Sequence, residues 1–223
     1  MTSGLGVIES ECYPNVKAVR TVAVRPGHGF WYCAQQGLLG KVAVDTLQKL
    51  SSTIASYEVL ATTSVSPHSP SLWDVHQQFA SLLRRLDLDR SQTIFPPLEV
   101  AAFQVARLYV TRLRNLLTGS PCSNIESITS DIRASLSQAS LNFQLCSNLG
   151  LFLWIFFSGC LLEPDNEFRE WLKVECYGVI CRLRFSDTQL EDMMEILSCF
   201  LWSTSLLGNT ARKFWDEVTD LVL

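Results

Sequence analysis

Apolar residues recur every three or four positions along most of the chain beyond Leu38, which is the spacing of one face of an α-helix. The pattern predicts helices over residues 38–61, 71–86, 96–117, 124–141, 149–162, 168–183, 186–202 and 210–223. Alternation of apolar and polar positions, which is typical of a half-buried strand, is nearly absent. We therefore expect an all-α fold, a single globular domain of about seven to eight helices.

The most apolar of these segments, LGLFLWIFFSGCLL at residues 149–162, contains fourteen residues and no charge. A helix of this length rises about 21 Å, which is too short for the roughly 30 Å hydrocarbon core of a bilayer. A helix that is apolar on every side must instead be covered on every side by other elements. We expect it to be the fully buried central helix of the domain, and we expect no membrane partner.

The helical pattern also indicates the domain organisation. Residues 1–37 combine a short apolar run with proline and glycine, and we expect an irregular N-terminal arm there. Residues 38–223 form the helical domain, interrupted by a proline- and serine-containing loop at 62–71. The N-terminus lacks the basic and apolar regions of a secretion signal, so the sequence predicts a soluble, cytoplasmic protein.

Charge and cysteine content limit the partners that we expect. The formal net charge is −4, and residues 163–223 hold 6 basic and 12 acidic side chains. This balance lacks the clustered Lys and Arg that phosphate binding requires, so we expect no direct nucleic acid binding. The eight cysteines include no CxxC pair and the three histidines are scattered, so we expect buried thiols and neither a metal nor a cofactor.

Catalytic motifs are missing as well. The sequence contains no GxSxG, HExxH, GxxxxGK[ST] or DDxxD, and its closest acidic pairs, Asp87 with Asp89 and Glu191 with Asp192, lack the spacing of a diphosphate site. The neighbours of Cys122 suggest an exposed loop, but no base or basic cluster in the sequence accompanies it. Arg107, Arg112 and Arg114 are interpreted as a solvated helix edge rather than an anion site. We expect no enzyme activity.

The final third of the chain carries a more specific signal. The strings FLWIFFSGCLLEPDNEFREWL, CRLRFSDTQLEDMMEILSCFLW and ARKFWDEV occur in this order between residues 152 and 218. Together they resemble the C-terminal end of the fungal-specific transcription factor domain, the regulatory region of fungal zinc binuclear cluster transcription factors. The matching positions are Leu153, Trp154, Ser158, Gly159, Trp171, Phe200, Leu201, Trp202, Arg212 and Trp215.

This resemblance implies a regulatory-type domain over 38–223, a nuclear location, and a non-catalytic regulatory or interaction protein. Its expected partners are transcription machinery, a homologous regulator or a small-molecule effector. The zinc-binding cluster of six cysteines that such regulators carry is missing, and if Met1 is the true start, the protein lacks their mode of DNA binding. Whether an upstream DNA-binding region is missing stays open here.

Two alternatives remain open from the sequence. The first is a small-molecule-binding protein or enzyme of fungal secondary metabolism on the same helical scaffold, with the aromatic-rich helices lining an apolar pocket. The residues that either line this pocket or pack the core are Trp154, Phe156, Trp171, Trp202 and Trp215. The second concerns the terminus KFWDEVTDLVL, which either docks on the core or forms an activating surface, since bulky apolar groups spaced by acids suit coactivator grooves.

Overall fold

The computed structural model of the chain describes residues 27–62, 74, 77–82, 84–85, 95–118, 125–143, 149–162, 166–183 and 190–220. These residues form helices and short turns without a strand, which confirms the predicted all-α class. The helices with defined bounds are α2 (His28–Gln35), α3 (Lys41–Thr62), α5 (Pro97–Thr118), α6 (Ile125–Phe143), α7 (Leu149–Leu162), α8 (Asn166–Leu183), α9 (Leu190–Ser198) and α10 (Thr204–Thr219). The predicted loop at 62–71, apart from Thr62, lies outside the described residues.

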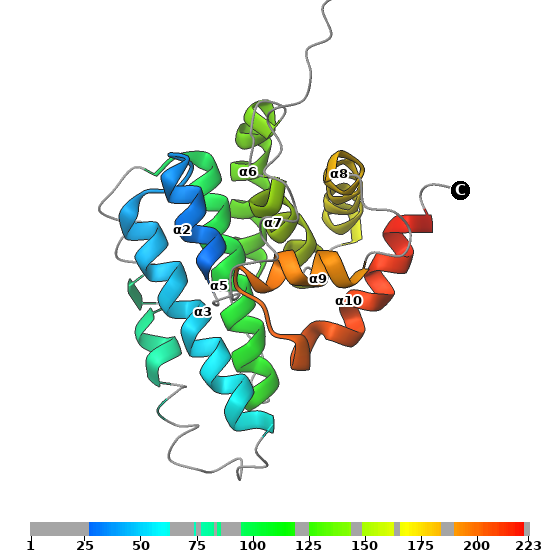
Figure 1. The fold of residues 1–223 in the computed structure, drawn as a ribbon. Helices are drawn as coiled ribbons and strands as arrows, with labels where there is room; N and C mark the ends of the chain where they lie inside the picture. The colour runs from blue at the N-terminus through cyan, green and yellow to red at the C-terminus, as the bar shows by residue number, and fades with distance from the viewer. Residues whose placement is uncertain are drawn as a thin grey trace, which may run out of the picture.

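Helix α7 occupies the centre of the molecule (Figure 1). Every one of its residues except Gly150 and Leu161 is buried. It contacts α2, α5, α8, α9 and α10, so other helices cover it on several sides. The prediction of a buried central helix is confirmed, and no helix among the described residues combines the length and the apolar character that crossing a membrane requires.

The remaining helices form two groups around α7. On one side, α5 packs against α6, α7 and α3, and α2 packs on α3 (Figure 1). On the other side, α8 lies against α7, and α10 contacts both α7 and α8. Side chains from Phe30 in α2 to Val218 in α10 belong to one contiguous hydrophobic core within the described part of the chain.

The C-terminal end of α7 is capped by a residue of another helix. Arg112 of α5 donates a hydrogen bond from Nε to the carbonyl oxygen of Leu162, at 3.1 Å. The last carbonyls of a helix lack partners within the helix, and a cation there also interacts favourably with the helix dipole. Arg112 is half-buried and therefore does not belong to the solvated edge that the sequence suggested.

The prediction of an irregular arm at residues 1–37 is wrong for residues 28–35, which form α2. Phe30 and Cys33, one turn apart, are fully buried in the core. Gly27, with φ of 80°, provides the left-handed turn before the helix. The helix is short and has no side-chain cap, so its stability comes from this packing, which sequence periodicity does not reveal.

Two predicted helix boundaries in the C-terminal part are also wrong. Helix α9 ends at Ser198 rather than at Trp202, and residues 199–203 form a buried turn. Helix α10 begins at Thr204 and runs through Gly208 and Asn209, where the sequence suggested a break. A glycine inside a helix costs about 1 kcal/mol relative to alanine, and packing of the following apolar face compensates for such a cost.

Candidate functional site

The aromatic residues singled out from the sequence lie on different sides of α7. Trp154 contacts Phe30 edge-on and stacks on Phe200, with ring centroids 5.1 and 6.0 Å away. Phe156 instead faces Trp171 of α8, with centroids 6.3 Å apart. Two positions along a helix are about 200° of rotation apart, which explains why these two rings point in different directions.

The two remaining tryptophans lie toward α10. Trp202 lies beside Phe157, with centroids 6.0 Å apart, and Phe157 also contacts Phe214 at 4.9 Å. Trp215, adjacent to Phe214, is 4% exposed. Four of these five residues are buried and one, Trp171, is half-buried. They lie on different sides of α7 and pack against it or its neighbours.

The turn at residues 199–203 accepts hydrogen bonds from donors in α2, α3 and α7 or at their ends, the α7 donor being the Trp154 indole. The backbone N–H of Gly29 donates to the Cys199 carbonyl at 2.7 Å, and that of Gly27 donates to the Phe200 carbonyl at 3.3 Å. Ser51 of α3 also donates to the Phe200 carbonyl, at 3.2 Å. A buried turn needs partners for its backbone carbonyls, and these hydrogen bonds tie α2 and α3 to the α9–α10 connection.

The end of this turn meets a partly buried polar cluster. Glu58 of α3 accepts hydrogen bonds through Oε1 from the Ser203 hydroxyl at 2.6 Å and from the Ser205 backbone N–H at 3.1 Å. Tyr109 of α5 lies close by, and burial together with the negative charge of Glu58 raises its pKa well above the ordinary range. Ser203 is fully buried, and its hydroxyl and the Ser205 backbone N–H both donate to Glu58, so the cluster caps the N-terminus of α10.

A second carboxylate reaches across to a helix end. Glu99, in the first turn of α5, accepts a hydrogen bond from the backbone N–H of Gly40 at 3.0 Å, just before α3. The side chain is 3% exposed. Burial raises the pKa of this carboxyl, and the hydrogen bond from Gly40 opposes the rise only in part. Sequence periodicity did not identify Glu58 or Glu99, because each acts on a helix distant in sequence.

Three of the buried thiols among the described residues lack the setting of a nucleophile. Burial raises the pKa of Cys160 and Cys176, and burial with the charge of Glu195 raises that of Cys199 to about 11. Thiols with raised pKa are protonated at neutral pH and react slowly. Cys181 is exposed, whereas Cys122 lies outside the described residues.

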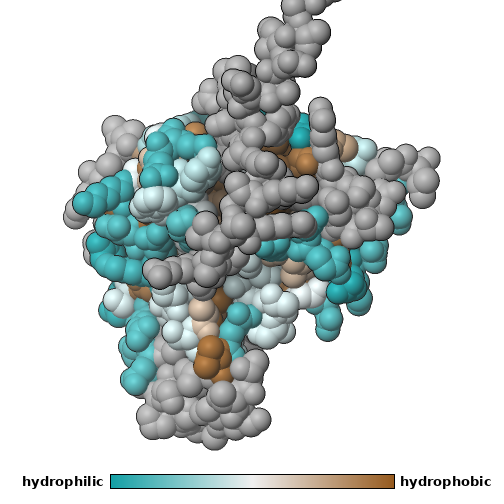
Figure 2. All heavy atoms as spheres, in the orientation of Figure 1, coloured by the Kyte–Doolittle hydropathy of each residue, from teal (hydrophilic) through white to brown (hydrophobic). Residues whose placement is uncertain are grey.

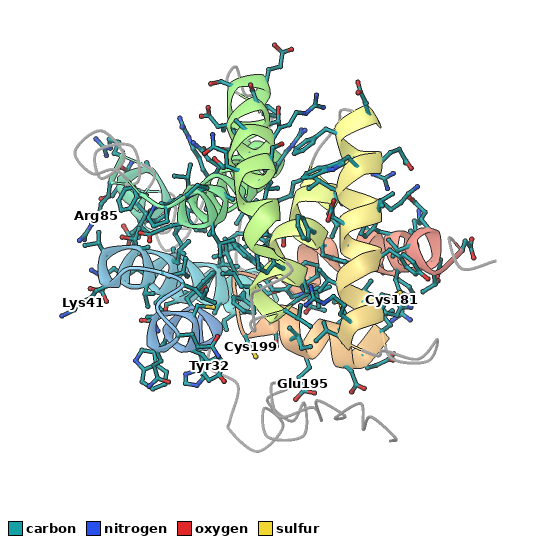
Figure 3. The ribbon with its side chains drawn as sticks, turned by 90° about the horizontal axis from the view of Figure 1, so that it is seen from above. Tyr32, Lys41, Arg85, Cys181, Glu195 and Cys199 are labelled. Carbon is teal, nitrogen blue, oxygen red and sulfur yellow. The ribbon has the colours of Figure 1, made fainter. Side chains whose placement is uncertain are left out.

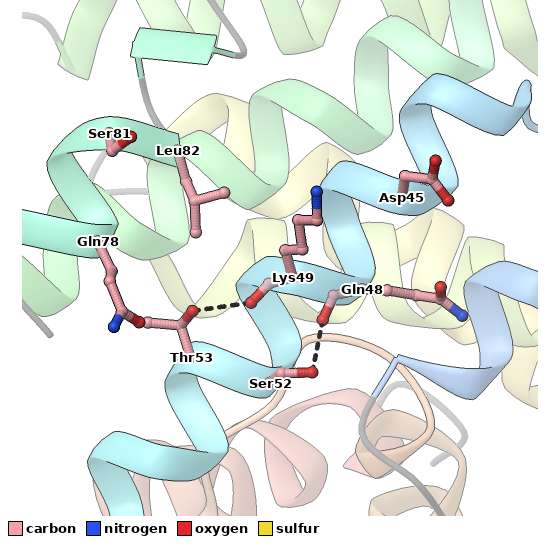
Figure 4. A pocket seen from close by; sticks show the side chains of 8 residues that line it. All are labelled: Asp45, Gln48, Lys49, Ser52, Thr53, Gln78, Ser81 and Leu82. Atoms are coloured by element: carbon pink, nitrogen blue, oxygen red, sulfur yellow. Dashed lines mark hydrogen bonds between the residues drawn. The ribbon is translucent and has the colours of Figure 1, made fainter.

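A polar groove lies between α3 and the helical residues 77–82 (Figure 4). Its volume is about 660 Å³, and it is open to solvent. The residues that line it are Asp45, Gln48, Lys49, Ser52, Thr53, Gln78, Ser81 and Leu82. Ser52 and Thr53 donate to the carbonyls of Gln48 and Lys49, so the charged and amide side chains are left as the main polar groups for a ligand.

None of the aromatic residues predicted to line a pocket belongs to this groove. No group of three or more His, Cys, Asp or Glu side chains among the described residues is placed to hold a metal ion. A site with one carboxylate, one ammonium and two amides suits a polar molecule through hydrogen bonds and ion pairing. The sequence signal for it is weak, since polar residues on the outer face of a helix are ordinary.

The chain matches no protein family model, no curated protein and no solved structure. The resemblance to the fungal regulatory domain therefore stays a prediction from the motif residues.

Proposed function

We propose that this protein is a non-catalytic regulatory or interaction protein of a transcriptional system, acting in the nucleus in the manner of the fungal regulatory domains that its final third resembles. One observation carries the proposal. All the motif residues from Leu153 to Trp215 except the exposed Arg212 are buried or half-buried, and the aromatic ones among them pack helices around α7 and hold the 199–203 turn. A motif with this role specifies a scaffold, and the function of a scaffold depends on the sites that it carries rather than on the fold itself.

The chemistry of the buried groups supports the same proposal. The hydroxyl of Ser203 and the carboxylate of Glu99 pair with groups of the protein itself, and the thiol of Cys176 is fully buried. A catalytic group must reach its substrate in a cleft, within hydrogen-bond distance. These side chains stabilise the interior of the protein, so we place the function on its exposed surface.

Tethering the protein to a reporter gene tests this proposal. The full chain, fused to an unrelated DNA-binding domain in a yeast reporter strain, is expected to raise or lower transcription several-fold relative to that DNA-binding domain alone. The destabilised variant Trp154→Ala, expressed as the same fusion, is expected to lose the effect. A wild-type fusion that occupies the reporter site and leaves transcription unchanged would contradict a regulatory function.

The polar groove favours a second candidate function, a small-molecule-binding protein of fungal secondary metabolism. Native mass spectrometry of the intact protein, purified from a fungal host, is expected to show a bound mass that the double variant Lys49→Met and Gln78→Leu loses. The double variant Lys213→Met and Asn209→Leu, on the exposed side of α10, serves as the control. A wild-type protein that carries no bound mass would contradict this function.

A further inference from the structure

Two opposite charges lie one helical turn apart in the polar groove between α3 and residues 77–82. Asp45 and Lys49 are both exposed residues of α3, and both line the groove. Residues four positions apart on a helix have Cβ atoms about 5–6 Å from each other. Within the described part of the chain, neither side chain forms a hydrogen bond or an ion pair, and the two do not pair with each other. Both charges are therefore available to a molecule that enters the groove.

The opposite wall of the groove supplies neutral groups. Gln78 and Ser81 offer an amide and a hydroxyl, and Leu82 is the one aliphatic side chain among the described lining residues. Figure 4 shows Gln78 and Leu82 on this wall, across from Lys49 and Thr53 of α3. The groove thus combines one anion, one cation and neutral hydrogen-bonding groups from two segments that are distant in the chain.

The groove has the size and the surroundings of a site for a small polar molecule. Its volume of about 660 Å³ lies within the range of roughly 300–1,000 Å³ that is usual for small-molecule sites. Figure 3 shows Lys41, at the start of α3, and Arg85, beyond the opposite wall, on the side of the molecule away from Cys181 of α8. Hydrophilic colour dominates the coloured part of the face seen in Figure 2, with hydrophobic colour in small separate areas.

We propose that this groove binds a free α-amino acid in its zwitterionic form, with the ligand carboxylate paired to Lys49 and the ligand ammonium paired to Asp45. This inference rests on the small-molecule-binding function proposed for the groove and specifies its ligand class. An ammonium donates charge-assisted hydrogen bonds to a carboxylate, so each charged end of the ligand meets its complement. The amides of Gln48 and Gln78 remain for the side chain of the ligand.

Charge balance argues against other small ligands. A simple anion would pair with Lys49 and would be repelled by Asp45 one turn away, and a simple cation would meet the reverse. An apolar ligand would remove water from both charges and leave each without a counter-charge, which is unfavourable. A zwitterion is neutral overall and pairs with both charges at once.

NMR titration of the full isotope-labelled chain tests the proposal, with each of the twenty standard amino acids in turn at about 0.15 M salt. At least one is expected to bind with a Kd of about 1 mM or tighter and to shift the backbone amide signals of residues 45–53. The tightest binder is then compared with its N-acetyl form, which lacks the ammonium, and with its carboxamide, which lacks the carboxylate. Each derivative is expected to bind about three- to tenfold more weakly.

Two substitutions assign the two ends of the ligand. Lys49→Met is expected to weaken amino acid binding by about three- to tenfold and to make the carboxamide bind as well as the amino acid itself. Asp45→Asn is expected to do the same for the N-acetyl form. The control variants Lys213→Met and Asp216→Asn make the same changes at exposed positions of α10 and are expected to keep the wild-type affinity.

Three results would overturn the proposal. The first is an absence of binding by all twenty amino acids. The second is binding of the N-acetyl form and the carboxamide as tight as that of the amino acid. The third is a loss of affinity in Lys213→Met equal to that in Lys49→Met, which would show that overall charge rather than the groove is responsible.

Native mass spectrometry separates this proposal from the proposed function. A bound mass from the fungal host that the double variant Lys49→Met and Gln78→Leu loses, together with an absence of amino acid binding, would overturn the ligand class and leave small-molecule binding in place. Amino acid binding that depends on Asp45 and Lys49, without a bound mass from the host, would support the ligand class and contradict the candidate function in secondary metabolism.

Discussion

The indole Nε1 of Trp154 donates a hydrogen bond to the carbonyl oxygen of Leu201 at 2.8 Å. Both residues are fully buried, and they come from two separate strings of the motif in the final third of the chain. The hydrogen bond joins the central helix α7 to the turn between α9 and α10. Because Phe200 also stacks on Trp154, this one tryptophan fixes the turn through a polar and an aromatic contact.

Trp154→Phe is expected to lower the free energy of unfolding by about 1–3 kcal/mol, since phenylalanine keeps an aromatic ring but leaves the buried Leu201 carbonyl without its donor. Urea denaturation followed by circular dichroism measures the loss. The matched variant Trp31→Phe, on the surface, should stay within about 0.5 kcal/mol of wild type. Equal stability of the two variants would contradict the role of this hydrogen bond.

Glu58 is expected to stabilise the N-terminus of α10, because Ser203, at the cap position, makes no side-chain cap of its own and donates to Glu58 instead. Glu58→Ala removes the acceptor of the Ser205 backbone N–H and should lower the free energy of unfolding by about 1–3 kcal/mol.

Glu58→Gln keeps an acceptor oxygen and loses only the charge at the positive end of the helix, so we expect a loss of about 0.3–1 kcal/mol. Hydrogen exchange provides a local readout: the Ser205 amide should exchange faster in Glu58→Ala than in Glu58→Gln. The same exchange rate in wild type and Glu58→Ala would exclude the capping role.

Periodicity was sufficient to predict the class of the fold and its central helix. The fourteen uncharged residues of α7 allow only a helix that is covered on all sides, and the structure buries all but two of them. These properties depend on neighbours within one or two helical turns, which a sequence displays directly.

The turn at residues 199–203 and the exposed side of α2 could not be predicted from the sequence, because both depend on contacts between residues that are distant in the chain. Residues 199–203 read as a continuation of α9, because nothing local shows that Gly29, Ser51 and Trp154 supply donors to their carbonyls. The exposure of Trp31 beside the burial of Phe30 depends in the same way on how α2 docks on the core. The sequence left open whether the aromatic residues of the motif pack the core or line a pocket. Which of their rings contact each other depends on how the helices pack, which the sequence does not show.

The free energy of unfolding should decrease as pH rises and Glu99 ionises. Burial raises the folded-state pKa of this carboxyl above its ordinary value of 4.5, so the folded state binds its proton more tightly than the unfolded chain. Between these two pKa values the folded state holds more protons, and the free energy of unfolding decreases as pH rises. This contribution is fully present below the ordinary pKa and is lost above the raised one.

The variant Glu99→Gln carries no titrating proton and retains an oxygen for the Gly40 N–H. Urea denaturation of both proteins at several pH values between about 4 and 7 should show wild type losing stability relative to the variant as pH rises. A gain of wild type over the variant across this range would show that the hydrogen bond outweighs burial.

Cysteine reactivity is expected to follow burial among the described thiols. In the native protein a maleimide should modify the exposed Cys181 well before Cys160 or Cys176, because burial raises the pKa of both buried thiols and blocks access. Peptide mass mapping after short labelling times measures the order. In denaturant the three should react at similar rates, and native labelling of Cys176 as fast as Cys181 would contradict the packing of α7 against α8.

Two glycines on the neighbouring helices α7 and α8 make a matched test of that packing. A methyl group at Gly178 would meet no atom within 4 Å, whereas one at Gly159 would lie 3.2 Å from Cδ1 of Leu172. Replacing glycine by alanine inside a helix stabilises it by about 0.5–1 kcal/mol when the space is open. Gly178→Ala is therefore expected to raise the free energy of unfolding by about this amount in urea denaturation.

Gly159→Ala gains the same helix propensity but presses on Leu172, which lies in a fully buried position between α7 and α8. Overpacking of a core forces side-chain and backbone shifts that typically cost about 1–3 kcal/mol. The net effect should therefore be a loss of stability, opposite in sign to Gly178→Ala. If the double variant Gly159→Ala with Leu172→Val recovers the loss, the contact with Leu172 is its cause, and a stabilising Gly159→Ala would show that α7 and α8 are less closely packed than the structure places them.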